Sequence, residues 1–396
     1  MKKVLVGAMA LLSLAACSNE EVLQKNEVNQ EIGFTAVTGK ATSRAADGYC
    51  NNAKPAEFKV WANVPTNKVY FTGDDYKLKD GLWQKEDGTV RYWPNGSITF
   101  FACKNATPNW KSDNSTLVAD FTVKNTVSEQ VDFIYAVQTV ATKPADGKTQ
   151  LNFRHALSQV EFMAKNQNKN IRVEITGVSV CNVFESAHFE FPTGNTNENY
   201  VDHNNTTTPT LANQGEWTNL SSLKKYNVEF AAVPLVGKEG ATAVSLTTDN
   251  DALKEYSSNT MYLIPQTLTT WVPADAPKPG DAANEKGYFL VKCKIWNVAK
   301  PDASDPDGGF KSATDVLIWP KTGAEYSEIA IPIPAVTWEQ GKRYVYTFVF
   351  TKDGNGGYNP NPDPSDPPKP EDVLVPIKLD ITVDDFVKGA DKDVTM

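Results

Sequence analysis

The chain has 396 residues, of which 40% are hydrophobic and 10% aromatic, so it is long enough for two domains with apolar cores. Its formal net charge is −9 and basic tracts are absent, which excludes nucleic acid as an expected partner. The 24 Pro and 24 Gly residues, with many Thr, Asn and Val, favour short strands and turns over long helices.

The first residues, "MKKVLVGAMALLSLAAC", have the pattern of an export signal. Two lysines precede an apolar run, Val4–Leu14, that is too short to span a bilayer. The small residues before Cys17 resemble a bacterial lipobox, which implies that residues 1–17 are a lipoprotein signal peptide ending at a lipidated Cys17. Acyl chains on this residue would anchor the precursor to a membrane. An ordinary signal peptide with a chance cysteine is the alternative.

Residues 18–44 are predicted to be a polar tether followed by a first strand, "EIGFTAV". Ile32, Phe34 and Ala36 alternate with small or polar residues, which indicates a strand with one buried face. Arg44 follows, one of only five arginines, alone among small residues in "GKATSRAADGYC". From the residues alone, Arg44 is either a solvated loop charge or a place where the chain is processed.

The rest of the chain is predicted to form two β-sandwich domains, 45–168 and 169–350. The boundary is placed at the polar run "KNQNKN", 165–170, between two series of strand-like segments. Residues 351–372 are rich in Pro, Gly and Asp and are predicted to be an extended linker.

The last segment, 373–396, carries the cleanest alternation in the chain. Five aliphatic side chains are predicted to share one face: Val375, Ile377, Leu379, Ile381 and Val383. Pro376 has no backbone donor, which suits an edge strand or a strand added to another sheet. Two interpretations are open: the strand pairs within its own sandwich, or it is donated to a neighbour.

Motifs for catalysis or metal binding are absent from the sequence, so no enzyme activity, metal or cofactor is predicted. Four cysteines lie beyond the signal segment: Cys50, Cys103, Cys181 and Cys293. No two of them have a CxxC spacing, so they are interpreted as buried thiols, with a disulfide left open because the spacing selects no pair.

Several segments in chain order resemble the fimbrillin family of Bacteroidales, the subunits of type V pili. They are "LAAC" at Cys17, "EIGFTAV" with "TSRAA" behind it, "YWP", "DFIYA", "LNFRHALSQVEF", "VEITGVSVCNV" and "GKRYVYTFVF". The resemblance covers nearly the whole mature chain. It implies an all-β fold of two tandem β-sandwich domains with transthyretin-like topology.

The resemblance also implies a route of assembly. In such pilins the precursor reaches the outer membrane as a lipoprotein, and an Arg-specific protease cuts after the first strand. Here the scissile bond would join Arg44 and Ala45, and the removed strand would carry Ile32, Phe34 and Ala36. A neighbour's strand, commonly its C-terminal one, fills the vacated groove; here this donor would be the 375–383 segment. Head-to-tail insertion does not close on itself and gives a filament.

The chain is therefore expected to be a structural subunit or adhesin of a cell-surface fimbria. Its expected partners are neighbouring pilin subunits in a homo- or hetero-polymer, the outer membrane through the lipid of the precursor, and a host or bacterial surface ligand. A monomeric surface glycan-binding lipoprotein is the alternative, motivated by the lipoprotein signal, the isoelectric point near 5.1 and the many Trp residues. A surface hydrolase that uses two carboxylates is a third class.

Overall fold

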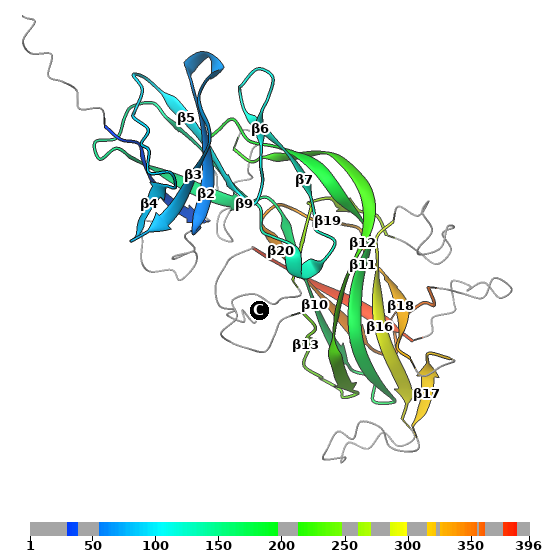
Figure 1. Cartoon of the computed structure of the whole chain (residues 1–396). Coiled ribbons are helices and arrows are strands. Elements are labelled where there is room, and N and C mark those ends of the chain that lie inside the picture. The colour runs from blue at the N-terminus through cyan, green and yellow to red at the C-terminus, as the bar shows by residue number, and fades with distance from the viewer. Residues whose placement is uncertain are drawn as a thin grey trace, which may run out of the picture.

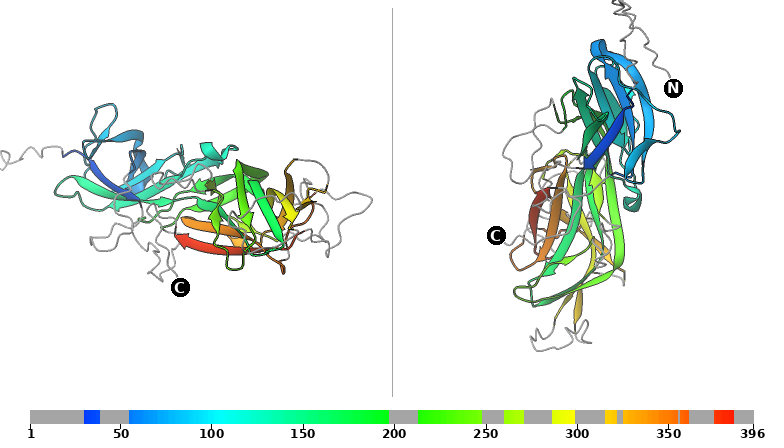
Figure 2. Two further views of the ribbon diagram at one scale, coloured as in Figure 1. Left: turned by 90° about the horizontal axis from the view of Figure 1, so that it is seen from below. Right: turned by 90° about the vertical axis from the view of Figure 1, so that its left-hand side faces the viewer.

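The structure, a computed structural model, describes residues 30–38, 55–196, 213–247, 260–270, 286–298, 315–321, 325–354, 356–360 and 375–385. These residues form an elongated all-β molecule of two lobes (Figures 1 and 2). Its only described helices are the single-turn η1 (Pro65–Asn67) and η2 (Val127–Glu129). Among the described residues, no helix is long and apolar enough to cross a membrane.

The N-terminal lobe is built on a seven-stranded sheet. Its strands, in spatial order, are β1 (Gly33–Thr38), β9 (Lys148–His155), β8 (Ile134–Val140), β5 (Ile98–Lys104), β2 (Glu57–Val64), β3 (Lys68–Lys79) and β4 (Leu82–Lys85). The sheet curls until β1 at one edge contacts β4 at the other. The curl encloses one apolar core, so β1 closes a barrel-like layer.

The central strands of this sheet are buried on both faces, which explains their nearly continuous apolar sequences. On β5, Phe100 and Ala102 point into the enclosed core, whereas Phe101 and Cys103 point into a second core. That second core is shared with β6 (Asn109–Trp110), β7 (Leu117–Thr122) and the end of β11 (Ile171–Glu190). The N-terminal lobe therefore has one core inside the curl and another against the rest of the molecule.

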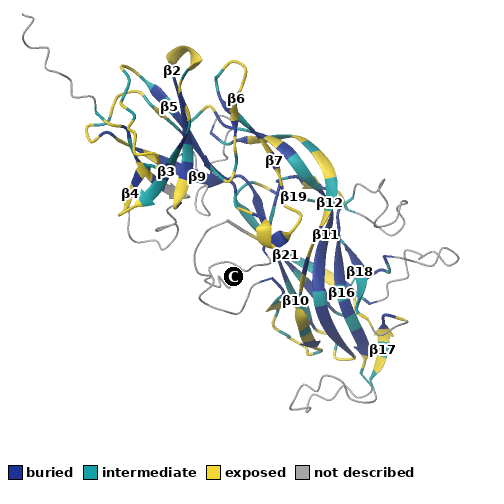
Figure 3. Ribbon diagram, in the orientation of Figure 1, coloured by how far each residue is buried: buried dark blue, intermediate teal, exposed yellow. Residues whose placement is uncertain are grey.

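Two very long strands join the lobes. β11 pairs along its length with β12 (Glu216–Val236) on one side. On its other side, β11 pairs first with β16 (Tyr288–Asn297) and then with β7. β17 (Val316–Trp319) and β18 (Ser327–Pro332) extend this sheet beside β16. Figure 3 shows β11 and β16 mainly in the colour of buried residues.

A further sheet covers the second core in the C-terminal lobe. Its strands are β13 (Val244–Ser245), β10 (Ser158–Asn166), β20 (Lys342–Phe350), β21 (Ile377–Asp385) and β14 (Met261–Leu263). A separate two-stranded sheet is formed by β15 (Thr267–Leu268) and β19 (Val336–Thr337). β10 pairs in parallel with β20, although β10 precedes the predicted boundary at 165–170. β11, which follows that boundary, reaches back to β7. Strand pairing therefore crosses the predicted boundary in both directions.

The predicted linker, 351–372, is wrong in its first part, because part of that segment packs on the C-terminal lobe. The backbone N–H of Gly356 donates to the carbonyl of Ile377 at 2.9 Å, and Tyr358, 6% exposed, pairs with Ala330. A Cβ on Gly357 would overlap the carbonyl oxygen of Val375. The glycines thus let the chain lie flat against β21, where the composition alone predicted an extended tether.

The interpretation of the cysteines as buried thiols is confirmed for three of them. Cys103, Cys181 and Cys293 are free and buried. Burial raises the pKa of the Cys181 thiol to about 12, which keeps it protonated and unreactive at neutral pH. Cys50 lies outside the described residues.

Candidate functional site

β1 is held in place mainly by backbone hydrogen bonds to segments far away in the sequence. It pairs in parallel with β9, from Gly33 opposite Lys148 to Thr38 opposite Phe153. At its start, the Ile32 N–H donates to the carbonyl of Arg91 at 2.7 Å, and the Gly33 N–H donates to the carbonyl of Gly147 at 2.8 Å. The segment is thus clasped on both sides. We call the space it fills, with these walls, the β1 site.

The inward face of β1 is apolar, as the alternation predicted. Ile32, Phe34 and Ala36 are 7%, 3% and 1% exposed. The Phe34 ring meets three other rings edge-on, and we call these three the aromatic cage: Phe58 at 6.2 Å, Tyr76 at 4.9 Å and Phe100 at 5.2 Å between ring centroids. A short strand of low intrinsic stability is thereby anchored by one ring at its centre.

An ion pair between the buried Asp74 and the partly exposed Arg91 lies in the wall of the β1 site opposite β9. The Arg91 guanidinium donates two hydrogen bonds to the Asp74 carboxylate, at 2.6 and 3.0 Å, and its hydrogen bond to Asp74 raises the pKa of Arg91. Burial, and then the Asp74 charge, raise the pKa of Tyr76, so this cage residue stays neutral. The Trp93 indole donates to the Gly147 carbonyl at 3.1 Å and ties the two walls together.

Gly147 allows the β9 side of the β1 site to approach the strand. Its φ is +70°, and a Cβ there would lie 2.7 Å from the carbonyl oxygen of Glu31. We expect Gly147→Ala to destabilise the docking of β1 by about 1–3 kcal/mol, because it combines backbone strain with a clash against backbone. Hydrogen exchange at the amides of Ile32 and Gly33 should accelerate accordingly.

Gly88→Ala is the matched control for this substitution. Gly88 has a similar φ of +72°, but a Cβ there would meet nothing within 4 Å. The strain is therefore similar and the clash is missing. If both variants changed β1 exchange equally, contact between Gly147 and the strand would have no part in holding it.

β21 is the second predicted functional element, and here it pairs antiparallel with β20 of its own chain, from Ile377 opposite Phe350 to Asp385 opposite Lys342. The burial of its inward face falls along the strand. Val375 and Ile377 are 3% and 1% exposed, Leu379 and Ile381 are half-buried, and Val383 is 50% exposed. Of the five predicted residues, Val375 precedes β21, and only Val375 and Ile377 lie fully in the core.

The structure does not bring together the two predicted strand elements, because β1 and β21 belong to different sheets. Cys17, Arg44 and Ala45 lie outside the described residues. Sequence reasoning missed Arg91, Trp93 and Gly147 as walls of the β1 site. The signals for them were the "YWP" turn and the Asp146–Gly147 turn, but neither reveals a partner strand over 50 residues away.

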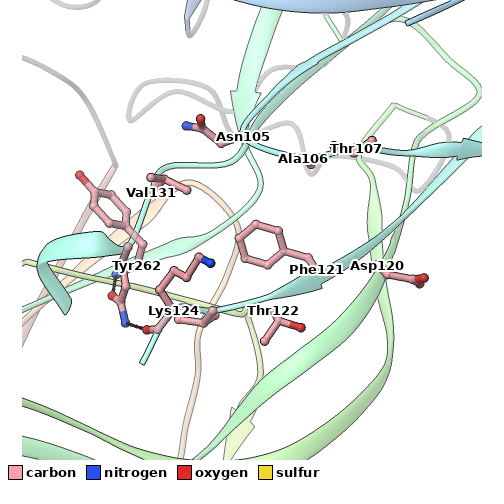
Figure 4. A pocket seen from close by; sticks show the side chains of 11 residues that line it. Asn105, Ala106, Thr107, Asp120, Phe121, Thr122, Lys124, Val131 and Tyr262 are labelled. Carbon is pink, nitrogen blue, oxygen red and sulfur yellow. Dashed lines mark hydrogen bonds between the residues drawn. The ribbon is translucent and has the colours of Figure 1, made fainter. Parts of the chain in front are cut away.

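A pocket of about 270 Å³ lies between β7, the segment after η2, and β14 (Figure 4). Phe121 and Tyr262 line it. Its buried Gln130 side chain is already engaged, donating to the Lys124 carbonyl at 3.0 Å and accepting from the Tyr262 N–H at 2.8 Å. This pocket is therefore a structural junction between strands.

The described residues give little support to a sugar-stacking surface or a metal centre. Every Trp side chain among them is buried or half-buried, which weakens the glycan-binding hypothesis that the many Trp residues motivated. Within the same residues, no group of three His, Cys, Asp or Glu side chains is placed to hold a metal ion.

The fold and the β1 site define a two-lobed all-β protein whose N-terminal strand completes a sheet from its edge. A family model described as fimbrillin-like matches residues 24–361. The chain belongs to the fimbrillin-like family. No curated protein matches this sequence.

Comparison with solved structures finds similar chains at low sequence identity. A fimbrial protein from Bacteroides vulgatus has a TM-score of 0.52 and 13% identity, covering 90% of this chain and 100% of that chain. A candidate cell adhesion protein from Parabacteroides distasonis has a TM-score of 0.45 and 10% identity, covering 90% and 99%. One from Bacteroides ovatus has a TM-score of 0.42 and 12% identity, covering 91% and 99%.

Proposed function

We propose that the chain is a structural subunit or adhesin of a cell-surface fimbria that is assembled by strand exchange after proteolysis. In this proposal the precursor is exported as a lipoprotein anchored through Cys17, and cleavage between Arg44 and Ala45 frees the segment that carries β1. A strand of a neighbouring subunit then enters the β1 site. The family and the all-β fold support a fimbrial role.

The observation that carries the proposal is the position of β1. It is an edge strand from the extreme N-terminal part of the described chain, and its three inward side chains are buried. Without β1, the sheet would expose the unpaired edge of β9 and an apolar groove lined by the aromatic cage. Such a groove would need another strand, and a neighbouring subunit can provide one.

β21 supports the donating half of the proposal less directly. Its last residues, from Leu379 onward, are progressively less buried. Separating this part from β20 would therefore expose the least additional apolar surface. Val375 and Ile377 lie between β20 and the 354–358 segment and would act as the fixed end of a donated strand. Donor-strand insertion is heterologous, so a chain with one groove and one donor extends into a filament.

Mass spectrometry of the protein from native cells tests the proposal, with wild type beside Arg44→Ala and Arg44→Lys. We expect a wild-type N-terminus at Ala45 and an intact, lipidated Cys17 N-terminus in both variants, because an Arg-specific protease does not cut after Lys. Unboiled gels should show a ladder of assembled species for the wild type alone. A wild-type chain that keeps Cys17 and forms no ladder would instead be an anchor subunit or a monomeric surface protein.

A further inference from the structure

The aromatic cage makes a specific demand on whatever strand fills the β1 site. The Phe34 ring stands at 80°, 89° and 90° to the rings of Phe58, Tyr76 and Phe100. Phe58 and Tyr76 are themselves stacked at 14°. A flat aromatic ring can make these three T-shaped contacts at once, whereas a branched aliphatic side chain has no ring quadrupole with which to make them.

The positions on either side of Phe34 limit the incoming strand further. Ala36, two residues after Phe34, is 1% exposed and stands opposite Leu151, which is fully buried. Ile32, two residues before, is 7% exposed. Backbone pairing with β9 fixes the alternation, so the inward positions read aliphatic, aromatic, small.

The chain's own C-terminal strand does not match this pattern. The inward residues of 375–383 are all aliphatic, and a slip by two residues only replaces one aliphatic by another. Phe386 is the one aromatic residue in 373–396. A register with Phe386 inward would place Asp384 and Lys388 at the two neighbouring inward positions, and unpaired charges are costly to bury there.

We propose that the β1 site selects a strand with an aromatic side chain at the position of Phe34, and that its natural occupant comes from a chain other than a second copy of this one. The inference rests on the proposed function, in which β1 leaves its site. The partner is a strand with the inward pattern aliphatic, aromatic, small. The subunit thus accepts a strand from one kind of chain and donates its own aliphatic strand to another kind. It is therefore a member of a hetero-polymer.

Peptide competition on the cleaved chain tests this selectivity. A site-specific protease sequence placed at 39–44 allows the full chain to be cut once, with the 30–38 segment still bound. A fluorescent peptide of residues 30–38 is exchanged into the cut protein and then displaced by unlabelled peptides. We expect the Phe34→Leu peptide and the 375–383 peptide to require at least tenfold higher concentrations than the wild-type peptide. The Thr35→Ala peptide, changed on the outward face, should compete as wild type does.

Competition by the Phe34→Leu peptide or the 375–383 peptide within threefold of wild type would overturn the selectivity. If no peptide entered the cut chain, exchangeability of β1, and with it the proposed function, would fail. The preference of the aromatic cage for an aromatic side chain is then tested in the uncut chain. There, Phe34→Leu should increase the hydrogen-exchange rate of the β1 amides at least tenfold over wild type. An increase of less than threefold there would overturn the inference independently of strand exchange.

Discussion

Phe34→Ala in the full chain is expected to lower the free energy of unfolding of the N-terminal lobe by about 3–5 kcal/mol, which is the range for truncating a buried aromatic side chain. Phe34 is 3% exposed and meets three rings edge-on. The substitution removes all three contacts and leaves a cavity inside the curl of the sheet. A loss of this size is a large fraction of the stability of an ordinary domain.

The effect is measured by unfolding the protein in urea, with the hydrogen exchange of the β8 and β9 amides as the readout for the N-terminal lobe. Thr35→Ala is the control, because Thr35 lies on the same strand and points outward, where the expected change is within about 0.5 kcal/mol. The exchange of β16 and β18 should stay near wild type, since these strands belong to the C-terminal lobe. A change of under about 1 kcal/mol for Phe34→Ala would mean that β1 is not seated in the cage.

Ile377→Ala should destabilise the C-terminal lobe by about 2–5 kcal/mol, whereas Val383→Ala should change it by less than about 0.5 kcal/mol. Both residues belong to the inward face of β21, but Ile377 is 1% exposed and Val383 is 50% exposed. Ile377 is also enclosed by Gly356, whose N–H donates to its carbonyl. The strand is therefore firmly held at its start and weakly held at its end.

The two variants are unfolded in denaturant, and the hydrogen exchange of the β20 amides is the readout. In the Ile377→Ala variant, the amides of β20 near Phe350 should lose protection, because Phe350 stands opposite Ile377. In the Val383→Ala variant, protection near Tyr344, opposite Val383, should be unchanged. Equal losses in both variants would contradict the gradient of burial and the idea of a fixed end.

The strands themselves could be read from the sequence because each carries its own periodicity. Ile32, Phe34 and Ala36 are buried as their alternation predicted, and the predicted C-terminal strand is found at Ile377–Asp385. The exposure of Val383 was not predictable, because alternation reports which face a side chain takes and not where the core beneath it ends.

The pairing partner of each strand could not be predicted from the sequence, because local periodicity does not encode long-range pairing. The parallel register of β1 on β9 joins residues more than 100 positions apart, and nothing local in "EIGFTAV" encodes it. The glycines of 354–357 were interpreted as signs of a tether, yet they let the backbone pack against Val375 and Ile377. Glycine serves both purposes, and only the neighbouring chain decides between them.

The long β11–β12 pair has a mechanical consequence. β11 has 20 residues, about 66 Å at 3.3 Å per residue, and it runs along the long axis of the C-terminal lobe as far as β7, at the junction with the N-terminal lobe (Figure 1). A pull along that axis loads its hydrogen bonds to β12 in shear, so that many must break together, whereas a pull across the axis would unzip them singly. Stretching force along this axis is therefore carried by the continuous backbone of β11 as far as its pairing with β7.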